Sequence, residues 1–271
     1  MKDIEFLKEK ARWVRRETFD IYKISPGIRL ASSLSDVEIF VALYYGGILK
    51  FDSKNPNWEE RDRFIISKGH GSISLYPILA DLDFFDKKEL ARISQEGSFL
   101  GDIPDTRIPG YETINGSLGH GLGVACGIAL ALKRKKSDSK VFVLSGDGEL
   151  NEGSIWEAVM FAGHHKLNNL ILIVDNNRTS MLDRSKNIIN LEPLENKFSD
   201  FKWKTERIDG HDAVKVCKSL KNLKEDKSEF PKVLIADTVK GRGIPQLEND
   251  AMSHSRVFKK EEIVEIAKNL Q

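Results

Sequence analysis

Several features that would place a chain in a particular class are scarce in this sequence. It has 2 cysteines in 271 residues. These are Cys126 and Cys217, and neither lies in a CxxC or Cys/His spacing, which argues against a disulfide scaffold or a cysteine zinc site and favours a reducing compartment. Lys and Arg number 42 against 41 Asp and Glu. This balance gives no general attraction for nucleic acid or an anionic membrane.

Long apolar runs are also lacking. No stretch approaches the roughly 18 apolar residues that a membrane helix needs. The start, Met1–Phe6, is charged and lacks the basic and then apolar regions of a secretory signal. We therefore expect a cytoplasmic protein with no membrane and no nucleic acid among its partners.

The composition that remains is that of a globular chain. It is 40% hydrophobic and 31% charged, which allows a sizeable core and argues against disorder. An α/β domain can run to about 250 residues as one unit, so we predict a single domain over residues 1–271.

Short apolar runs alternate with helical patterns along most of the chain. Continuous apolar runs are typical of parallel strands that are covered on both faces. The predicted strands are Arg63–Ile66, Val141–Leu144, Leu170–Val174 and Val233–Ala236. The predicted helices are Ile4–Tyr22, Ser74–Leu82, Gly121–Lys136, Ser154–His164, Ala213–Lys224 and Lys260–Leu270. The pattern predicts a doubly wound α/β fold with a mostly parallel sheet and helices on both faces. Such sheets bind ligands at the carboxyl ends of their strands.

One further helix start is predicted from a local signal. Ser35 stands three residues before Glu38, at the head of the apolar run 39–44. This spacing predicts a capping box with Ser35 as the N-cap.

A Gly-Asp-Gly segment follows one predicted strand. Gly146, Asp147 and Gly148 come directly after the run 141–144 and Ser145. Glycines let the backbone approach a phosphate, while the carboxylate can reach a hard cation. Alone, the segment is also consistent with an ordinary turn.

A second polar segment follows the next predicted strand, where Asp175-Asn176-Asn177-Arg178-Thr179 comes after the run 170–174. A carboxylate, an amide oxygen and a main-chain carbonyl, completed by phosphate oxygens and water, suit octahedral magnesium. The two segments together are far more specific than either alone.

The paired segments resemble the binding motif of thiamine diphosphate enzymes, in which Gly-Asp-Gly is followed about thirty residues later by Asn-Asn. The chain resembles in particular the amino-terminal, diphosphate-binding domain of transketolase. Segments 61–71, 115–123 and 240–243, the last followed by His254, resemble three further stretches of that domain.

The resemblance implies a role for each matching residue. Asp147, Asn177 and the carbonyl of Thr179 would hold magnesium, or calcium or manganese in its place. The thiamine diphosphate contacts would come from His70, Gly116, Ser117, Leu118, Gly146, Asp147, Gly148, Glu149, Asn177 and His254. His70, His254 and Glu152 would be the catalytic residues, with Glu152 at a subunit interface that couples paired sites. In the alternative interpretation, His70 caps a helix, His254 is a loop histidine and Leu118 is core.

Two positions depart from the family pattern. Arg29 and Asp102 stand near positions where transketolases have histidines that contact the sugar. Guanidinium only donates hydrogen bonds and carboxylate normally only accepts them, so neither replaces imidazole conservatively. Arg29 could bind a carboxylate or phosphate. Alternatively, Arg29 and Asp102 pair with each other and contact no substrate.

No residue matches the glutamate that activates the cofactor, which belongs to the family's pyrimidine-binding domain. The resemblance therefore implies a split enzyme, in which a separate chain carries the pyrimidine-binding and carboxy-terminal domains. Two copies of each chain would form a heterotetramer. The expected function is transfer of a two-carbon ketol or acyl unit to an aldehyde or ketone acceptor, with altered substrate specificity. The alternatives are one component of a carboligase that decarboxylates 2-oxo acids, and a non-catalytic regulatory component.

Overall fold

A computed structural model describes residues 4–248, 250 and 252–270. The first three residues of the charged start lie outside this range. At the centre is a five-stranded sheet in the order β1-β2-β3-β5-β4, and all neighbouring strands are parallel. The strands are β1 (Arg63–Ile66), β2 (Val141–Gly146), β3 (Leu170–Asn176), β4 (Lys204–Asp209) and β5 (Lys232–Asp237). The predicted fold class is confirmed.

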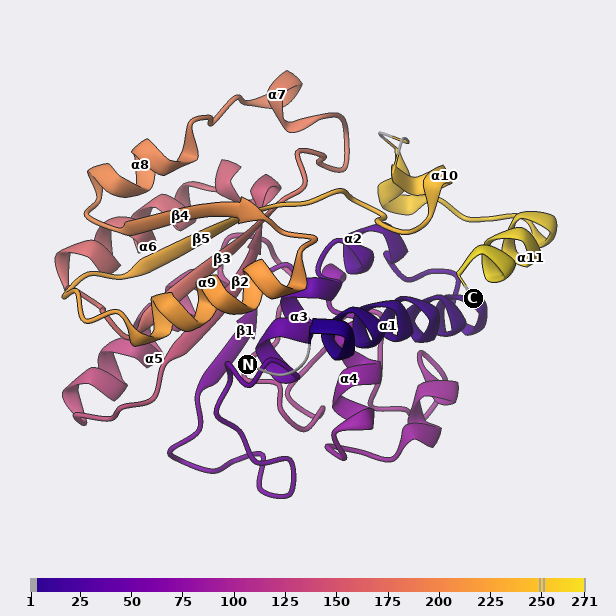
Figure 1. The fold of residues 1–271 in the computed structure, drawn as a ribbon, viewed down its shortest axis with the longest axis horizontal. Helices are drawn as coiled ribbons and strands as arrows, with labels where there is room; N and C mark the ends of the chain where they lie inside the picture. The colour runs from indigo at the N-terminus through magenta and orange to yellow at the C-terminus, as the bar shows by residue number, and fades with distance from the viewer. Residues whose placement is uncertain (1–3, 249, 251, 271) are drawn as a thin grey trace.

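The larger helices match the predicted ones within a few residues. They are α1 (Ile4–Ile24), α3 (Val37–Tyr44), α4 (Leu75–Asp81), α5 (Gly121–Arg134), α6 (Gly153–His164), α9 (Ala213–Glu225) and α11 (Lys260–Asn269). Four short helices complete the set that Figure 1 labels: α2 (Leu30–Leu34), α7 (Ser185–Ile188), α8 (Leu194–Asp200) and α10 (Pro245–Glu248). None of the described helices combines the length and apolar character needed to cross a membrane.

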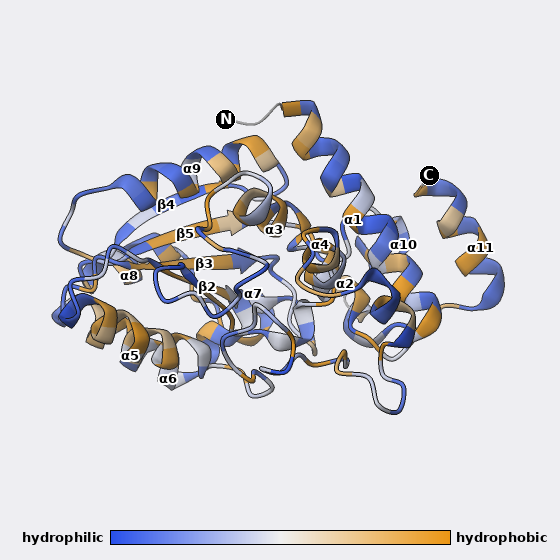
Figure 2. Cartoon of the chain, turned by 90° about the horizontal axis from the view of Figure 1, so that it is seen from below, coloured by the Kyte–Doolittle hydropathy of each residue, from blue (hydrophilic) through white to orange (hydrophobic). Residues whose placement is uncertain are grey.

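The central strands bury both of their faces. In β2, Phe142 and Leu144 belong to one core cluster, whereas Val141 and Val143 belong to another. Side chains alternate along a strand, so the two clusters lie on opposite faces of the sheet. Helices α1, α3 and α9 contribute to the first cluster, and α5 and α6 to the second. Figure 2 shows largely apolar strands between the layer that contains α9 and α3 and the layer that contains α5 and α6.

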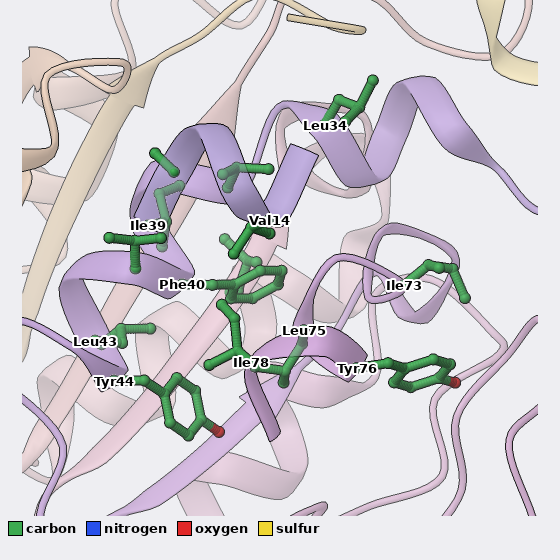
Figure 3. Packing of buried hydrophobic residues seen from close by; sticks show 14 of the residues in the cluster. Val14, Leu34, Ile39, Phe40, Leu43, Tyr44, Ile73, Leu75, Tyr76 and Ile78 are labelled. Atoms are coloured by element: carbon green, nitrogen blue, oxygen red, sulfur yellow. The ribbon is translucent and has the colours of Figure 1, made fainter. Parts of the chain in front are cut away.

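The first cluster extends well beyond the sheet. Figure 3 shows Val14 of α1 beside Phe40 of α3, with Ile78 of α4 close by. All three side chains are 0% exposed. This packing holds α1 and α4 beyond the carboxyl ends of the strands (Figure 1).

Two local features differ from the sequence-based expectation. The predicted capping box at Ser35 is wrong, because α3 begins at Val37 with Asp36 at its N-cap and no side-chain cap bond. Ser35 instead donates from its hydroxyl to Asp175 at 2.8 Å, and Glu38 pairs with Arg15. Strand β4 is an addition to the four predicted strands. Its sequence is mostly polar, and the strand lies half-exposed at the sheet edge.

Candidate functional site

The Gly-Asp-Gly segment and the Asn-Asn segment meet at the carboxyl edge of the sheet. Gly146 at the end of β2 is in register with Asp175 of β3, so Asp147 and Asn177 each follow within two residues of that pair. A cavity of about 630 Å³ opens there, and its lining includes Asp147, Asn177, Thr179 and Lys240. The structure thus brings the three predicted metal ligands to one cavity.

Asp147 is nearly enclosed, with 8% of its surface exposed. Its Oδ2 accepts a hydrogen bond from Ser185 Oγ at 2.7 Å. Burial raises the pKa of Asp147, and the nearby charge of Asp175 raises it further. A buried carboxylate of this kind gains most from a bound cation.

The loop after β3 directs polar oxygens to the same place. Asn177 donates from Nδ2 to Asp175 Oδ2 at 2.8 Å, and its Oδ1 accepts from the Thr179 amide at 3.1 Å. The Thr179 carbonyl accepts from Lys240 Nζ at 3.2 Å. The Lys240 ammonium therefore already contacts the Thr179 carbonyl, which is one of the predicted metal ligands.

His70 and His254 face each other from distant parts of the sequence. Their ring centroids are 5.1 Å apart, and Lys240 Nζ lies 3.3 Å from His254 Nδ1. Burial, followed by the charges of Lys68, His254, Lys240 and Arg29, lowers the pKa of His70 to about 3. Burial and then Lys240 lower the pKa of His254 to about 4, while burial and Lys68 lower the pKa of Lys240 to about 8. Cationic groups crowd this site, which suits an anionic ligand.

The depressed pKa of His70 predicts a specific loss of stability in acid. Its folded pKa lies below the ordinary 6.5, so the unfolded chain binds more protons once the pH falls below about 6.5. Between pH 6.5 and 4, His70 should lower the free energy of unfolding by up to about 1.4 kcal/mol for each pH unit of acidification. Urea unfolding at several pH values should show a shallower acid-side slope for His70→Asn. Equal slopes for the two proteins would contradict this environment for His70.

Tight backbone contacts hold the glycine-rich segment against the His70 turn. A Cβ added to Gly69 would lie 2.0 Å from the Asn115 carbonyl oxygen, so a larger residue there would force the segments apart. Glu149, 1% exposed, accepts from Ser67 Oγ at 2.6 Å and from the Gly119 amide at 2.8 Å. It also accepts from the Gly146 amide at 3.1 Å. Glu149 therefore ties three predicted cofactor segments together.

The remaining predicted residues of this region lie at its surface. Gly116 and Ser117 are exposed and Leu118 is half-buried, so all three are open to a ligand. Glu152 is exposed at the N-cap of α6, with its Cβ 2.7 Å from the position that a Cβ on Gly119 would take. Glu152 therefore lies at the start of α6 and is not among the residues that line the cavity beside Asp147.

Arg29 and Asp102 lie on neighbouring loops without pairing. Arg29 donates to the Gly27 carbonyl at 3.4 Å, and a Cβ added to Gly27 would lie 3.4 Å from Asp102 Oδ2. Asp102 accepts from Ser94 Oγ at 2.6 Å and from Ser25 Oγ at 3.3 Å. Among the ion pairs of the described residues, none joins Arg29 to Asp102. The positive charge of Arg29 acts on both His70 and His254, which favours a position facing the site.

An arginine on β4 anchors the loop that carries Asn177. Arg207 pairs with Glu192 at 2.7 Å, with Glu195 at 3.0 Å and with Asp237 at 2.9 Å. Asp237 in turn accepts from Asn176 Nδ2 at 2.7 Å and from Arg178 at 2.9 Å. The loop after β3 is thus bound to the outermost strand of the sheet.

Three charged residues of the site are not singled out by the sequence patterns. In the sequence analysis, Lys240 and Lys68 appear only as members of the segments 240–243 and 61–71, and each is next to a glycine. Asp175 resembles an ordinary strand end, yet it is 0% exposed and contacts Lys68. A lysine next to a glycine after a predicted strand is the one sequence signal that could have indicated Lys68 and Lys240. The residues that they contact lie in distant segments, so the sequence does not predict those contacts.

Known proteins resemble this chain in sequence and in fold. Residues 25–271 match the family model described as "Transketolase, thiamine diphosphate binding domain". The chain is 36% identical to the 6-deoxy-6-sulfo-D-fructose transketolase subunit SqwG of a Clostridium species, over 92% of this chain and 90% of that protein. It is 38% identical to one of the apulose-4-phosphate transketolase subunits of Actinobacillus succinogenes, over 95% and 93%. The structure superposes on transketolase from Campylobacter jejuni with a TM-score of 0.90 and 33% identity. That match covers 98% of this chain and 42% of the longer one.

Proposed function

The chain belongs to the transketolase family, and from this premise we propose that it is the cofactor-binding component of a two-component transketolase-like enzyme. In this proposal it binds thiamine diphosphate and Mg²⁺, and the assembled enzyme transfers a two-carbon ketol unit to an aldehyde or ketone. The observation that carries the proposal is the cavity at the carboxyl edge of the sheet, where Asp147, Asn177 and Lys240 converge.

The residues around this cavity fit a metal-bound diphosphate. Asp147 and Asn177 offer a carboxylate and an amide oxygen, which are ligands that Mg²⁺ accepts. Asn151 also lines the cavity, and its buried Oδ1 has no hydrogen-bond partner in the described structure. Lys68, Lys240 and Arg29 repel the protonated forms of the two histidines, and an anion would relieve that repulsion.

Glycines leave room for the rest of the cofactor. A Cβ added to Gly116 would meet nothing within 4 Å, so a flat ring can approach this backbone. Leu118 beside it supplies an apolar contact. In this proposal Gly146 and Gly148 offer backbone to the diphosphate, while Glu149 shapes the pocket by fixing the Gly119 and Ser67 segments.

When bound, thiamine diphosphate supplies a nucleophilic carbon and an electron sink for breaking a carbon–carbon bond next to a carbonyl. The chain itself supplies His70 and His254, whose low pKa values keep both imidazoles neutral near pH 7. A neutral imidazole can donate or accept a hydrogen bond to a carbonyl or hydroxyl oxygen. An anion bound nearby would raise the pKa of both imidazoles toward the range in which they can pass protons.

A partner chain completes the proposed enzyme. Two relatives of similar length are named as transketolase subunits. On this chain, α5 and α6 expose Val124, Met160 and Phe161, and residues of both helices line a further cavity. We assign this face, with Glu152 at its margin, to subunit contacts in a heterotetramer.

Co-expression with a chain that carries the pyrimidine-binding domain, encoded by an adjacent gene, tests the function. The complex should transfer a labelled two-carbon unit from a ketose phosphate to an aldehyde. Mass spectrometry would identify the labelled product. Release of labelled carbon dioxide from a 2-oxo acid, with no ketol transfer, would instead establish a decarboxylating carboligase. A complex that binds the cofactor but turns over neither substrate would support a regulatory role.

Arg29 and Asp102 are proposed to set the substrate. Because they stand near the positions of histidines that contact the sugar in transketolases, the assembled enzyme should use xylulose 5-phosphate poorly. Arg29→His with Asp102→His should raise kcat/KM on that donor by roughly tenfold to a hundredfold, since a hydrogen bond to a hydroxyl is worth about 1–3 kcal/mol.

Arg12→His is the matched control, because Arg12 is exposed on α1. It should leave kcat/KM unchanged. Efficient use of xylulose 5-phosphate by the native enzyme would show that its specificity is not altered.

A further inference from the structure

Four donors converge on the carboxylate of Asp175, near the carboxyl end of the central strand β3. Its Oδ2 accepts from Ser35 Oγ at 2.8 Å, from Asn177 Nδ2 at 2.8 Å and from Lys68 Nζ. Its Oδ1 accepts from Thr238 Oγ1. The side chain is 0% exposed, so these partners come from the protein itself. This side chain acts purely as an acceptor.

An acceptor at this position determines which way the Asn177 amide points. Only the NH₂ group of an amide can face an oxygen that has no hydrogen to donate. With Nδ2 held at Asp175, Oδ1 lies on the other side of the amide. Asn177 lines the cavity that Asp147 also lines. Although Oδ1 already accepts from the Thr179 amide, it keeps a second lone pair.

We propose that Asp175 is a positioning residue that holds the amide of Asn177 with its oxygen toward the metal. This inference rests on the proposed function, because the metal is the Mg²⁺ of the cofactor site. Asp175 acts through Asn177 and is not itself a ligand, since four donors already use its oxygens. Mutation of a residue that hydrogen-bonds to a metal ligand typically weakens metal binding by about 10–100-fold.

Lys68 makes this buried acceptor tolerable. Its ammonium, in a side chain 3% exposed, lies between Asp175 and Asp36, at 2.8 Å from Asp36. A buried carboxylate without a counter-charge would be strongly unfavourable. Lys68 thus provides the charge that allows Asp175 to remain an acceptor next to the acidic Asp147.

The test is a calorimetric titration of Mg²⁺ into the full chain in complex with its partner. Thiamine diphosphate is present at a saturating concentration. Asp175→Asn should weaken Mg²⁺ binding by about 10–100-fold, because its own NH₂ can turn the Asn177 amide around. Asn177→Asp should also weaken binding, although it adds a negative ligand. Its carboxylate cannot donate to Asp175 and would be repelled by it.

The double variant Asp175→Asn with Asn177→Asp separates positioning from simple structural support. Asn at 175 can donate to Asp at 177, which restores an oriented oxygen, so Mg²⁺ affinity should recover most of the loss. Ser35→Ala is the matched control. It removes one donor from Asp175 without touching Asn177, and should change affinity by less than about threefold.

Each outcome bears on one of the two proposals. If the native complex binds thiamine diphosphate equally with and without Mg²⁺, the proposed metal site is wrong. If native binding needs Mg²⁺ but Asp175→Asn matches it, the positioning role is wrong. Should Asp175→Asn not fold, Asn177→Asp still decides, because it leaves the buried acceptor in place. Tighter Mg²⁺ binding by that variant would overturn the inference.

Discussion

Replacement of Asp147 by alanine should abolish Mg²⁺-dependent binding of thiamine diphosphate. Asp147 is the one carboxylate among the proposed metal ligands, and it is buried at the cavity wall. Its removal leaves two neutral oxygens, which hold a divalent ion poorly. We expect at least roughly a hundredfold loss of affinity, measured by calorimetry on the assembled complex with and without Mg²⁺.

Asp138→Asn is the matched control for this variant. Asp138 is exposed before the opposite end of the same strand, and its change should leave binding as it is. If Asp147→Ala binds thiamine diphosphate as tightly as the native protein does, the assignment of Asp147 to the metal site is wrong. Circular dichroism of both variants would show whether the fold is retained.

The second large effect concerns the chain by itself. Purified without a partner, it should show no turnover, because in the proposed two-component enzyme the glutamate that activates the cofactor comes from the partner chain. Addition of the pyrimidine-domain partner should create activity that saturates near equal stoichiometry. The expected difference is between background and full turnover, measured by product formation from a labelled ketose phosphate.

Glu152 offers an internal check on this result. If subunit contacts complete the site, Glu152→Ala should shift saturation to higher partner concentrations while thiamine diphosphate still binds. Robust turnover by the single chain, with mass spectrometry excluding a contaminating partner, would contradict the two-component proposal.

The central strands are predictable from the sequence because they are apolar throughout and covered on both faces. The run 170–174, for example, is buried at every position. Strand β4 is not predictable in this way, because its residues Lys204–Asp209 are mostly polar and half-exposed. An edge strand is fixed by its pairing with β5 rather than by a pattern of its own.

The capping box fails for a related reason. Ser35 and Glu38 have the correct spacing for a local cap, but both are committed to distant partners: Asp175 for Ser35, and Arg15 and His211 for Glu38. Local spacing predicts a local bond only where tertiary contacts do not compete.

The candidate site divides along the same line. Strand ends and glycines are visible in the sequence, so Asp147 and Asn177 can be placed at one edge. The contacts of Lys240 with Thr179 and His254 join segments that are far apart in the chain. No local pattern predicts such contacts, and the crowding of positive charge around His70 emerges only with the fold.

The attachment of the loop after β3 to Arg207 has a consequence for the stability of that loop. Arg207 lies on β4, which is half-exposed and paired on one side only. Edges of this kind undergo local unfolding more readily than central strands. We therefore expect the stability of this edge to limit the order of the loop after β3, even though that loop begins at a fully buried strand. Hydrogen exchange should then release the amides of β4 and of the 177–192 loop together.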